Sequence, residues 1–188
     1  ITFGSGGTGT VTLGSAVRGG GNHITFANDY TIDTNGSYIG GQGNNTIRTK
    51  ANVDASIIGS GEFRMFVNST LRTESGSTLT MDAKITEASG VENLTKTDVG
   101  TLILNGANTY TGATTVSAGT LQLGAGGATG SLTGTSGISL ASGTTLAVNR
   151  TGSITVSAPV TGAGAVINSG TGTLIMGGAN TYTGATTV

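Results

Sequence analysis

Residues 100–116 read GTLILNGANTYTGATTV, and residues 172–188 read GTLIMGGANTYTGATTV. Fifteen of the seventeen positions are identical, with Gly172 in the second copy corresponding to Gly100 in the first. Self-similarity at a fixed offset is typical of solenoids and related arrays, in which one small unit stacks on the next. The repeat therefore predicts a stacked fold rather than a single globular core.

The residues between the two copies form short runs in which apolar and polar side chains alternate. Alternation with period two places successive side chains on opposite faces of a strand. Gly, Ser, Asn and Thr separate the runs, and these residue types favour turns. No helical spacing occurs here, so we expect short strands at residues 120–123, 138–140, 145–148, 154–156 and 165–167.

One inward position per coil can be assigned across this half of the chain. The candidates, at nearly even spacing, are Leu102, Leu121, Leu140, Val156 and Leu174. Four coils of about 18 residues would fill the offset between the two copies, and three longer coils would also fit. No Asn-Gly or Asp-Gly turn joins adjacent strong strands, which disfavours a hairpin-built sandwich. We predict an all-β parallel β-helix of roughly nine to ten coils, stacked about 4.8 Å apart.

The two halves of the chain differ in charge. All nine acidic residues lie within residues 1–98, whereas Arg150 is the only charged residue beyond Asp98. We therefore divide the chain into an irregular, more charged segment (1–98) and a segment with the long repeat (99–188), as one continuous solenoid truncated at both ends. In the first half, strands are expected at residues 10–13, 23–26, 63–67 and 79–81. Charged residues recur there twenty positions apart, which suggests neighbouring coils: Asp54/Glu74, Glu62/Asp82 and Arg64/Lys84.

Composition excludes several classes of protein. The formal net charge is −1 and Lys and Arg do not cluster, so we expect no nucleic-acid-binding surface. No apolar run approaches the roughly 18 residues of a membrane-spanning helix. The chain has no Cys, which excludes a disulfide framework. It has neither an initiator Met nor a signal peptide at Ile1, so we expect that it was cut from a longer protein.

Residues 100–124, GTLILNGANTYTGATTVSAGTLQLG, resemble the autotransporter-associated β-strand repeat, also called the passenger-associated transport repeat. Leu94-Thr95-Lys96-Thr97 is similar to the start of this repeat, and the second copy stops at Val188. The resemblance implies a right-handed parallel β-helix secreted across the outer membrane by a C-terminal β-barrel, which is absent from this chain. The absence of Cys agrees with that route, because a disulfide would obstruct passage of an unfolded passenger.

Paired carboxylates are the first candidate catalytic groups, because some β-helices process polysaccharides. Glycoside hydrolysis needs two carboxyl groups about 5–10 Å apart, which Glu62 with Asp82, or Asp54 with Glu74, could provide on adjacent coils. No aromatic platform or basic cluster accompanies them in the sequence. We therefore interpret these four residues as solvated surface charge.

The sequence lacks the residues that usually form metal sites and nucleophilic catalytic sites. His23 is the only histidine and follows a Gly-rich turn, so we assign it a structural role. Residues 40–47, GGQGNNTI, nearly match a calcium-binding nonapeptide, but Asn45 replaces the necessary Asp and only one copy occurs. One His without Cys cannot build a zinc site. We predict no catalytic residue, no metal site and no cofactor.

Two further patterns are interpreted as structural. Thr-x-Thr pairs lack the constant spacing of an ice-binding array, and ordinary β-propensity explains them: Thr78/Thr80, Thr95/Thr97, Thr109/Thr111 and Thr133/Thr135. In the repeated loop, Asn108 and Tyr110 recur as Asn180 and Tyr182. An exposed Tyr could bind a ligand, but we expect the ring to cover the end of the core.

These observations predict a non-enzymatic, extracellular or cell-surface rod that acts as a stalk, spacer or display scaffold. The first alternative is an adhesin that binds a host glycan or protein through loops of the charged half, and the second is a polysaccharide-processing enzyme. End-to-end or lateral self-association is also expected, because coil ends expose unpaired strand edges. Contact with a membrane is expected only through the C-terminal barrel.

Overall fold

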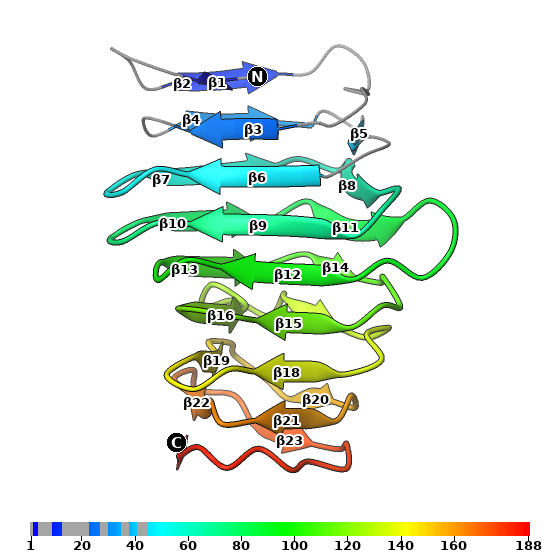
Figure 1. Cartoon of the computed structure of the whole chain (residues 1–188), viewed down its shortest axis with the longest axis vertical. Coiled ribbons are helices and arrows are strands. Elements are labelled where there is room, and N and C mark those ends of the chain that lie inside the picture. Colours follow the sequence, from blue (N-terminus) through cyan, green and yellow to red (C-terminus); the bar gives the residue numbers. More distant parts are fainter. Residues whose placement is uncertain (1, 4–8, 13–22, 27–29, 35–37, 41–44) are drawn as a thin grey trace.

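The structure is a computed structural model that describes residues 2–3, 9–12, 23–26, 30–34, 38–40 and 45–188. Short strands wind around one axis as a right-handed solenoid, and the chain descends coil by coil from the N-terminal to the C-terminal end (Figure 1). All strand pairs in the described ranges are parallel. The predicted parallel β-helix is confirmed.

Two long sheets run along the stack. Sheet A holds eight described strands, in the order β1 (Thr2–Phe3), β3 (His23–Phe26), β6 (Asn45–Thr49), β9 (Ser69–Thr73), β12 (Leu94–Thr97), β15 (Thr114–Val116), β18 (Ile138–Leu140) and β21 (Val160–Gly162). Sheet B holds nine, in the order β2 (Gly9–Thr12), β4 (Tyr30–Asp33), β7 (Asp54–Ile58), β10 (Thr78–Met81), β13 (Thr101–Leu104), β16 (Thr120–Leu123), β19 (Thr145–Val148), β22 (Ala165–Asn168) and β24 (Thr186–Thr187). Both sheets therefore pass through both halves of the chain.

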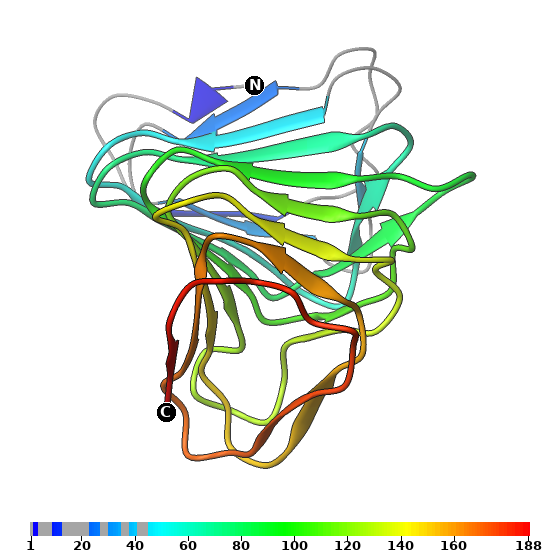
Figure 2. The same cartoon turned by 60° about the horizontal axis from the view of Figure 1, so that its bottom comes forward.

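A third side of the coils is here called face C, and in the described part of the chain it consists of three shorter sheets. They are β5 (Tyr38–Ile39), β8 (Glu62–Met65) and β11 (Lys84–Glu87), then β14 (Ala107–Asn108) with β17 (Ser131–Leu132), then β20 (Ile154–Val156) with β23 (Leu174–Met176). Viewed obliquely along the axis, the three faces enclose the interior of the coil (Figure 2). No helix in the described part of the chain is long and apolar enough to cross a membrane.

The core is a set of columns in which inward side chains stack on each other from coil to coil. On sheet B, Leu79, Leu102, Leu121, Leu146 and Val166 are in register and fully buried. On β10, β13 and β16 the outward neighbours of these residues are half-buried, as period-two alternation requires. Each buried aliphatic side chain contributes about 1.5–3 kcal/mol, so a thin column can hold a Gly-rich chain in this fold.

The coils are longer than the predicted 18 residues and nearer the alternative of three longer coils, so part of the predicted register is wrong. Leu102 stacks on Leu121 as expected, but Leu121 stacks on Leu146 and not on Leu140. Leu140 lies on sheet A instead, and β20 and β23, which hold Val156 and Leu174, lie on face C. Because coils are longer than about 18 residues, the described strands form fewer turns than the nine to ten expected.

Candidate functional site

Charged side chains gather on face C, where β8 and β11 pair. Glu62 accepts hydrogen bonds from the guanidinium of Arg64 on its own strand and from Thr86 Oγ1 at 2.8 Å. Lys84 lies opposite Glu62 in register and places its Nζ 3.8 Å from the carboxylate. These four residues are called the Glu62 cluster below.

The protonation state of Glu62 bears on the enzyme hypothesis. Burial alone would raise the pKa of its carboxyl, but hydrogen bonds from Arg64 and Thr86 and the charges of Arg64 and Lys84 hold the pKa below its ordinary 4.5. A general acid needs a raised pKa to carry its proton at neutral pH. Glu62 is therefore ionised and neutralised by cations, which suits an ion pair that joins two coils.

The carboxylate pairs considered from the sequence do not follow the register of the coils. Lys84, not Asp82, lies opposite Glu62, and Thr78, not Glu74, lies opposite Asp54. Asp82 accepts a hydrogen bond from Asn105 Nδ2 at 2.6 Å, and Asp54 accepts one from the backbone N–H of Thr78 at 3.0 Å. The twenty-residue pairing is therefore wrong, because these coils are longer than the spacing of the charges.

Ion pairs also link successive coils beside sheet A. Arg48 Nε donates to Glu74 Oε1 at 2.6 Å, and Arg72 Nε donates to Asp98 Oδ2 at 3.1 Å. Burial would raise the pKa of Glu74, but the hydrogen bonds from Arg48 and from the Ala51 N–H, with nearby positive charge, lower it. Each arginine thus reaches the corner of the following coil, where its charge is neutralised.

Lys96 is a charged residue in an otherwise aliphatic column. Its strand neighbours in register are Leu71 and Val116, and all three side chains are fully buried. Its Nζ donates to the carbonyls of Thr97 at 2.9 Å, Asp98 at 2.6 Å and Ala118 at 3.2 Å. Burial lowers the pKa of Lys96 to about 8, partly opposed by the charge of Asp98.

The ammonium of Lys96 holds a strained corner. Asp98 has a positive φ of 62°, which is unusual for a residue other than Gly. Two of the bound carbonyls belong to this corner, and the third belongs to Ala118 on the next coil. Lys96 therefore ties two successive coils together where the chain passes from sheet A to sheet B.

The repeated loop supplies a second buried polar link. Asn108 is buried, and its Oδ1 accepts from the Ile85 N–H at 2.8 Å in the preceding coil. Its Nδ2 donates to the Gly106 carbonyl at 2.9 Å and to the Ser131 carbonyl at 3.0 Å in the following coil. One side chain thereby joins three coils.

The tyrosine of the repeated loop belongs to the core. Tyr110 is buried, and its hydroxyl lies 2.7 Å from Thr114 Oγ1. Burial raises the pKa of Tyr110 well above its ordinary value, and the hydrogen bond with Thr114 only partly offsets that effect. The prediction that this ring covers the core is confirmed.

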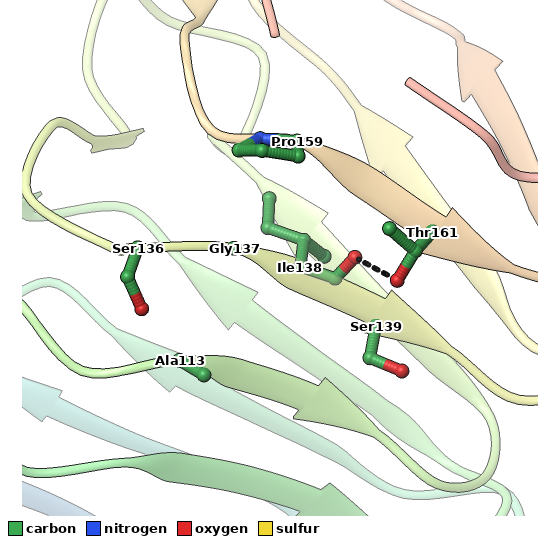
Figure 3. A pocket seen from close by; sticks show the side chains of 7 residues that line it. All are labelled: Ala113, Ser136, Gly137, Ile138, Ser139, Pro159 and Thr161. Atoms are coloured by element: carbon green, nitrogen blue, oxygen red, sulfur yellow. Dashed lines mark hydrogen bonds between the residues drawn. The ribbon is translucent and has the colours of Figure 1, made fainter. Parts of the chain in front are cut away.

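A shallow hollow lies on the outer surface of sheet A near the starts of its strands (Figure 3). Its volume is about 360 Å³, and most of the side chains that line it are small. The lining residues are Ala113, Ser136, Gly137, Ile138, Ser139, Pro159 and Thr161. They include neither charged nor aromatic side chains, so the hollow offers a ligand no strong anchor.

The remaining sequence candidates are dispersed. His23 lies in β3, opposite Thr46 in register. The calcium-like stretch includes residues 41–44, which lie outside the described residues. Thr78 and Thr80 lie on sheet B, whereas Thr95 and Thr97 lie on sheet A, so the two pairs share no face. Among the described residues, no three His, Asp or Glu side chains gather as metal ligands.

The coil-joining roles of Lys96 and Asn108 were not predicted from the sequence. Lys96 carries a signal, because Leu94-Thr95-Lys96 alternates and thereby puts the lysine on the inward side of the strand. For Asn108 the sequence gives no signal beyond the recurrence of the residue, since two of its three partners, Ile85 and Ser131, lie on other coils. Both residues join coils, and neither forms part of an open cleft.

Comparison with known proteins agrees with this geometry. The family described as passenger-associated-transport-repeat matches residues 94–123 and 166–188. The chain is similar to the adhesin BmaC autotransporter of Brucella suis biovar 1 (strain 1330), with 36% identity over 140 residues, 62% of this chain and 4% of that protein. The chain thus spans only a small part of this relative's length. No solved structure matches it.

The two matched repeats coincide with the coils that contain Lys96, Asn108 and Tyr110 or their counterparts, and they lie on a parallel β-helix. The chain is therefore a segment of an autotransporter passenger domain that contains passenger-associated transport repeats.

Proposed function

We propose that this segment is a structural rod at the bacterial cell surface or in the extracellular space, where it acts as a stalk or display scaffold without enzymatic activity. The observation that carries the proposal is the continuity of sheets A and B through the described coils. Stacked parallel strands with paired charges and a buried column give a stiff body whose length scales with the number of coils.

Two measurements on the purified chain test the rod. Small-angle scattering should give an elongated particle, and limited proteolysis should leave the coils from β6 to β22 intact. A compact spherical particle would contradict the proposal. For location, surface labelling of intact cells that express the full-length protein should reach this segment, and protection until the cells are lysed would contradict it.

The second candidate function is adhesion, which the name of the relative from Brucella supports. The Glu62 cluster is the charged surface that such binding would use. Glu62→Gln combined with Lys84→Ala should leave the circular dichroism spectrum and the rod length unchanged. If the segment is a spacer, the variant and the unchanged chain should retain equal, low signals on host glycans and cells. A specific signal lost in the double variant would favour the adhesin.

The enzyme alternative has a direct test. The chain is incubated with plant and host polysaccharides, and the products are analysed by mass. We expect no turnover, because the carboxylate of Glu62 is neutralised and Asp82 is bonded elsewhere. Turnover that is abolished by Glu62→Gln or Asp82→Asn would overturn the non-enzymatic assignment.

Self-association of the chain stays a prediction that sedimentation at high concentration can test.

A further inference from the structure

Each matched repeat closes into one coil of the same length. In the first copy β12 pairs with β15, and the Leu94 N–H donates to the Ala113 carbonyl at 2.9 Å. In the second copy β22 pairs with β24, and the Val166 N–H donates to the Ala185 carbonyl at 2.9 Å. Both pairings join residues twenty positions apart. The beginning of each repeat thus stacks directly on its own end.

The tight packing at this closure is also the same in both copies. A Cβ added to Gly112 would lie 2.1 Å from the Glu92 carbonyl oxygen, and one added to Gly184 would lie 2.2 Å from that of Gly164. The two glycines are equivalent positions of the two copies, and so are the two residues they pack against. The closure is therefore a property of the repeat, since the surrounding sequences differ.

The polar links recur as well. Asn180 Oδ1 accepts from the Val160 N–H at 2.9 Å, as Asn108 accepts from Ile85 at 2.8 Å. The hydroxyls of Tyr182 and Thr186 lie 2.7 Å apart, the same distance as in the first copy. Each repeat thus carries one side chain that bonds the preceding coil and one that secures its own corner.

The two equivalent coils nevertheless occupy different faces of the rod. The first copy begins on sheet A with β12 and continues on sheet B with β13, whereas the second begins on sheet B with β22 and continues on face C with β23. Leu102, Leu121, Leu146 and Val166 are in register on sheet B, so three whole coils separate Leu102 from Val166. Leu174, the counterpart of Leu102, lies beyond Val166 on the next face, face C. The 72-residue offset is therefore three coils plus one face. The same contacts therefore form at two orientations around the axis.

We propose that the twenty-residue segment 94–113, like its counterpart 166–185, is a self-closing coil module that stacks at any face of the solenoid. The module contains its own closure and its own lock on the preceding coil, and its tyrosine secures the corner through the threonine that directly follows the module. Its outward side chains point in different directions in the two copies, so the repeats do not build one shared ligand-binding face. Their task is to close and lock a coil wherever the chain needs one.

An insertion into the full chain tests the module. A second copy of residues 166–185, which begin on sheet B, is inserted between Ala113 and Thr114, where a coil begins on sheet A. Because the insert is one whole coil, later strands should keep their faces. We expect a folded rod, longer by about 4.8 Å, with resistance to proteolysis equal to that of the unchanged chain. The control insert contains the same twenty residues in scrambled order and should create a protease-sensitive site.

Equal protease sensitivity of the two inserts would overturn the proposal, as would an insert that is excluded as a loop without lengthening the rod.

Hydrogen exchange provides a second, independent readout. Asn108→Ala should accelerate exchange of the Ile85 amide at least tenfold, and Asn180→Ala should do the same to the Val160 amide. Because Asn180 lies in the last coil, its substitution does not put the folding of the other coils at risk. The control Asn105→Ala removes a half-buried asparagine of the same loop that contacts neither amide, and it should spare both. Unchanged exchange in both lock variants would also overturn the proposal.

Discussion

At the level of single residues, Lys96 shows how a charge is accommodated in the column between Leu71 and Val116. Its stem packs like an aliphatic side chain, while its ammonium is bonded by three carbonyls at a corner. The lowered pKa indicates that these carbonyls replace water incompletely. The stem therefore stabilises the coil more than the charge does.

We predict that Lys96→Met is more stable than Lys96→Ala by about 2–4 kcal/mol, because Met fills the column and Ala leaves a cavity. Urea unfolding followed by circular dichroism measures both variants against the unchanged chain. Lys84→Ala, which removes an exposed lysine on face C, is the control and should change stability by less than about 1 kcal/mol. Equal stability of the Met and Ala variants would show that the charge, and not the packing, is what matters at this position.

The pH dependence of stability follows from the same residue. The pKa of Lys96 is about 8 in the folded chain and near 10.5 in the unfolded chain, so between these values the unfolded chain binds more protons. Stability must then rise with pH, by about 1.4 kcal/mol per unit for this group. We expect the unchanged chain to gain stability relative to Lys96→Met between pH 8 and 10. Tyr110, whose pKa burial raises, opposes the gain above pH 10 in both proteins and cancels in the difference. A constant difference across this range would contradict the assignment.

At the level of elements, the positions of the strands could be predicted from sequence, but the face of the solenoid to which each strand belongs could not. Alternation identified the strands at Thr120–Leu123 and Thr145–Val148 and their inward residues. It did not show that Leu140 belongs to sheet A, because an inward residue looks the same on all three faces. Corners of variable length carry that information, and their Gly and Ser residues have no periodicity. The coil-joining roles of Lys96 and Asn108 were missed for the same reason, since their partners are set by the register.

Corner glycines have a testable steric role. A Cβ added to Gly100 would lie 2.3 Å from the Glu74 carbonyl oxygen and 2.6 Å from that of Ser77, both backbone atoms of the preceding coil. We expect Gly100→Ala to destabilise the chain by about 1–3 kcal/mol, because the coils must separate to admit the methyl group. Gly127→Ala is the matched control, since no atom lies within 4 Å of its added Cβ. The control should be neutral or gain up to about 1 kcal/mol. Similar midpoints in guanidinium for the two variants would refute the steric argument.

At the level of the whole molecule, the charges and the core are organised differently along the axis. Ion pairs such as Arg48 with Glu74 join coils in the N-terminal half, where all the acidic residues lie. The C-terminal half depends on apolar columns and on backbone ladders, and its surface is nearly uncharged. Added salt should therefore affect the exchange of N-terminal amides more than that of C-terminal ones, since it screens only exposed pairs.

The stack is quasi-one-dimensional, so a defect should spread to neighbouring coils and then fade. Leu121→Ala removes the side chain that stacks between Leu102 and Leu146, at a cost of about 2–5 kcal/mol. We expect hydrogen exchange to accelerate in β13, β16 and β19, while β7, three coils away, keeps its protection. Gln122→Ala, on the outward side of the same strand, is the control and should change little. If β7 loses as much protection as β16, the rod unfolds as one cooperative unit and its coils are not the separate modules that stacking implies.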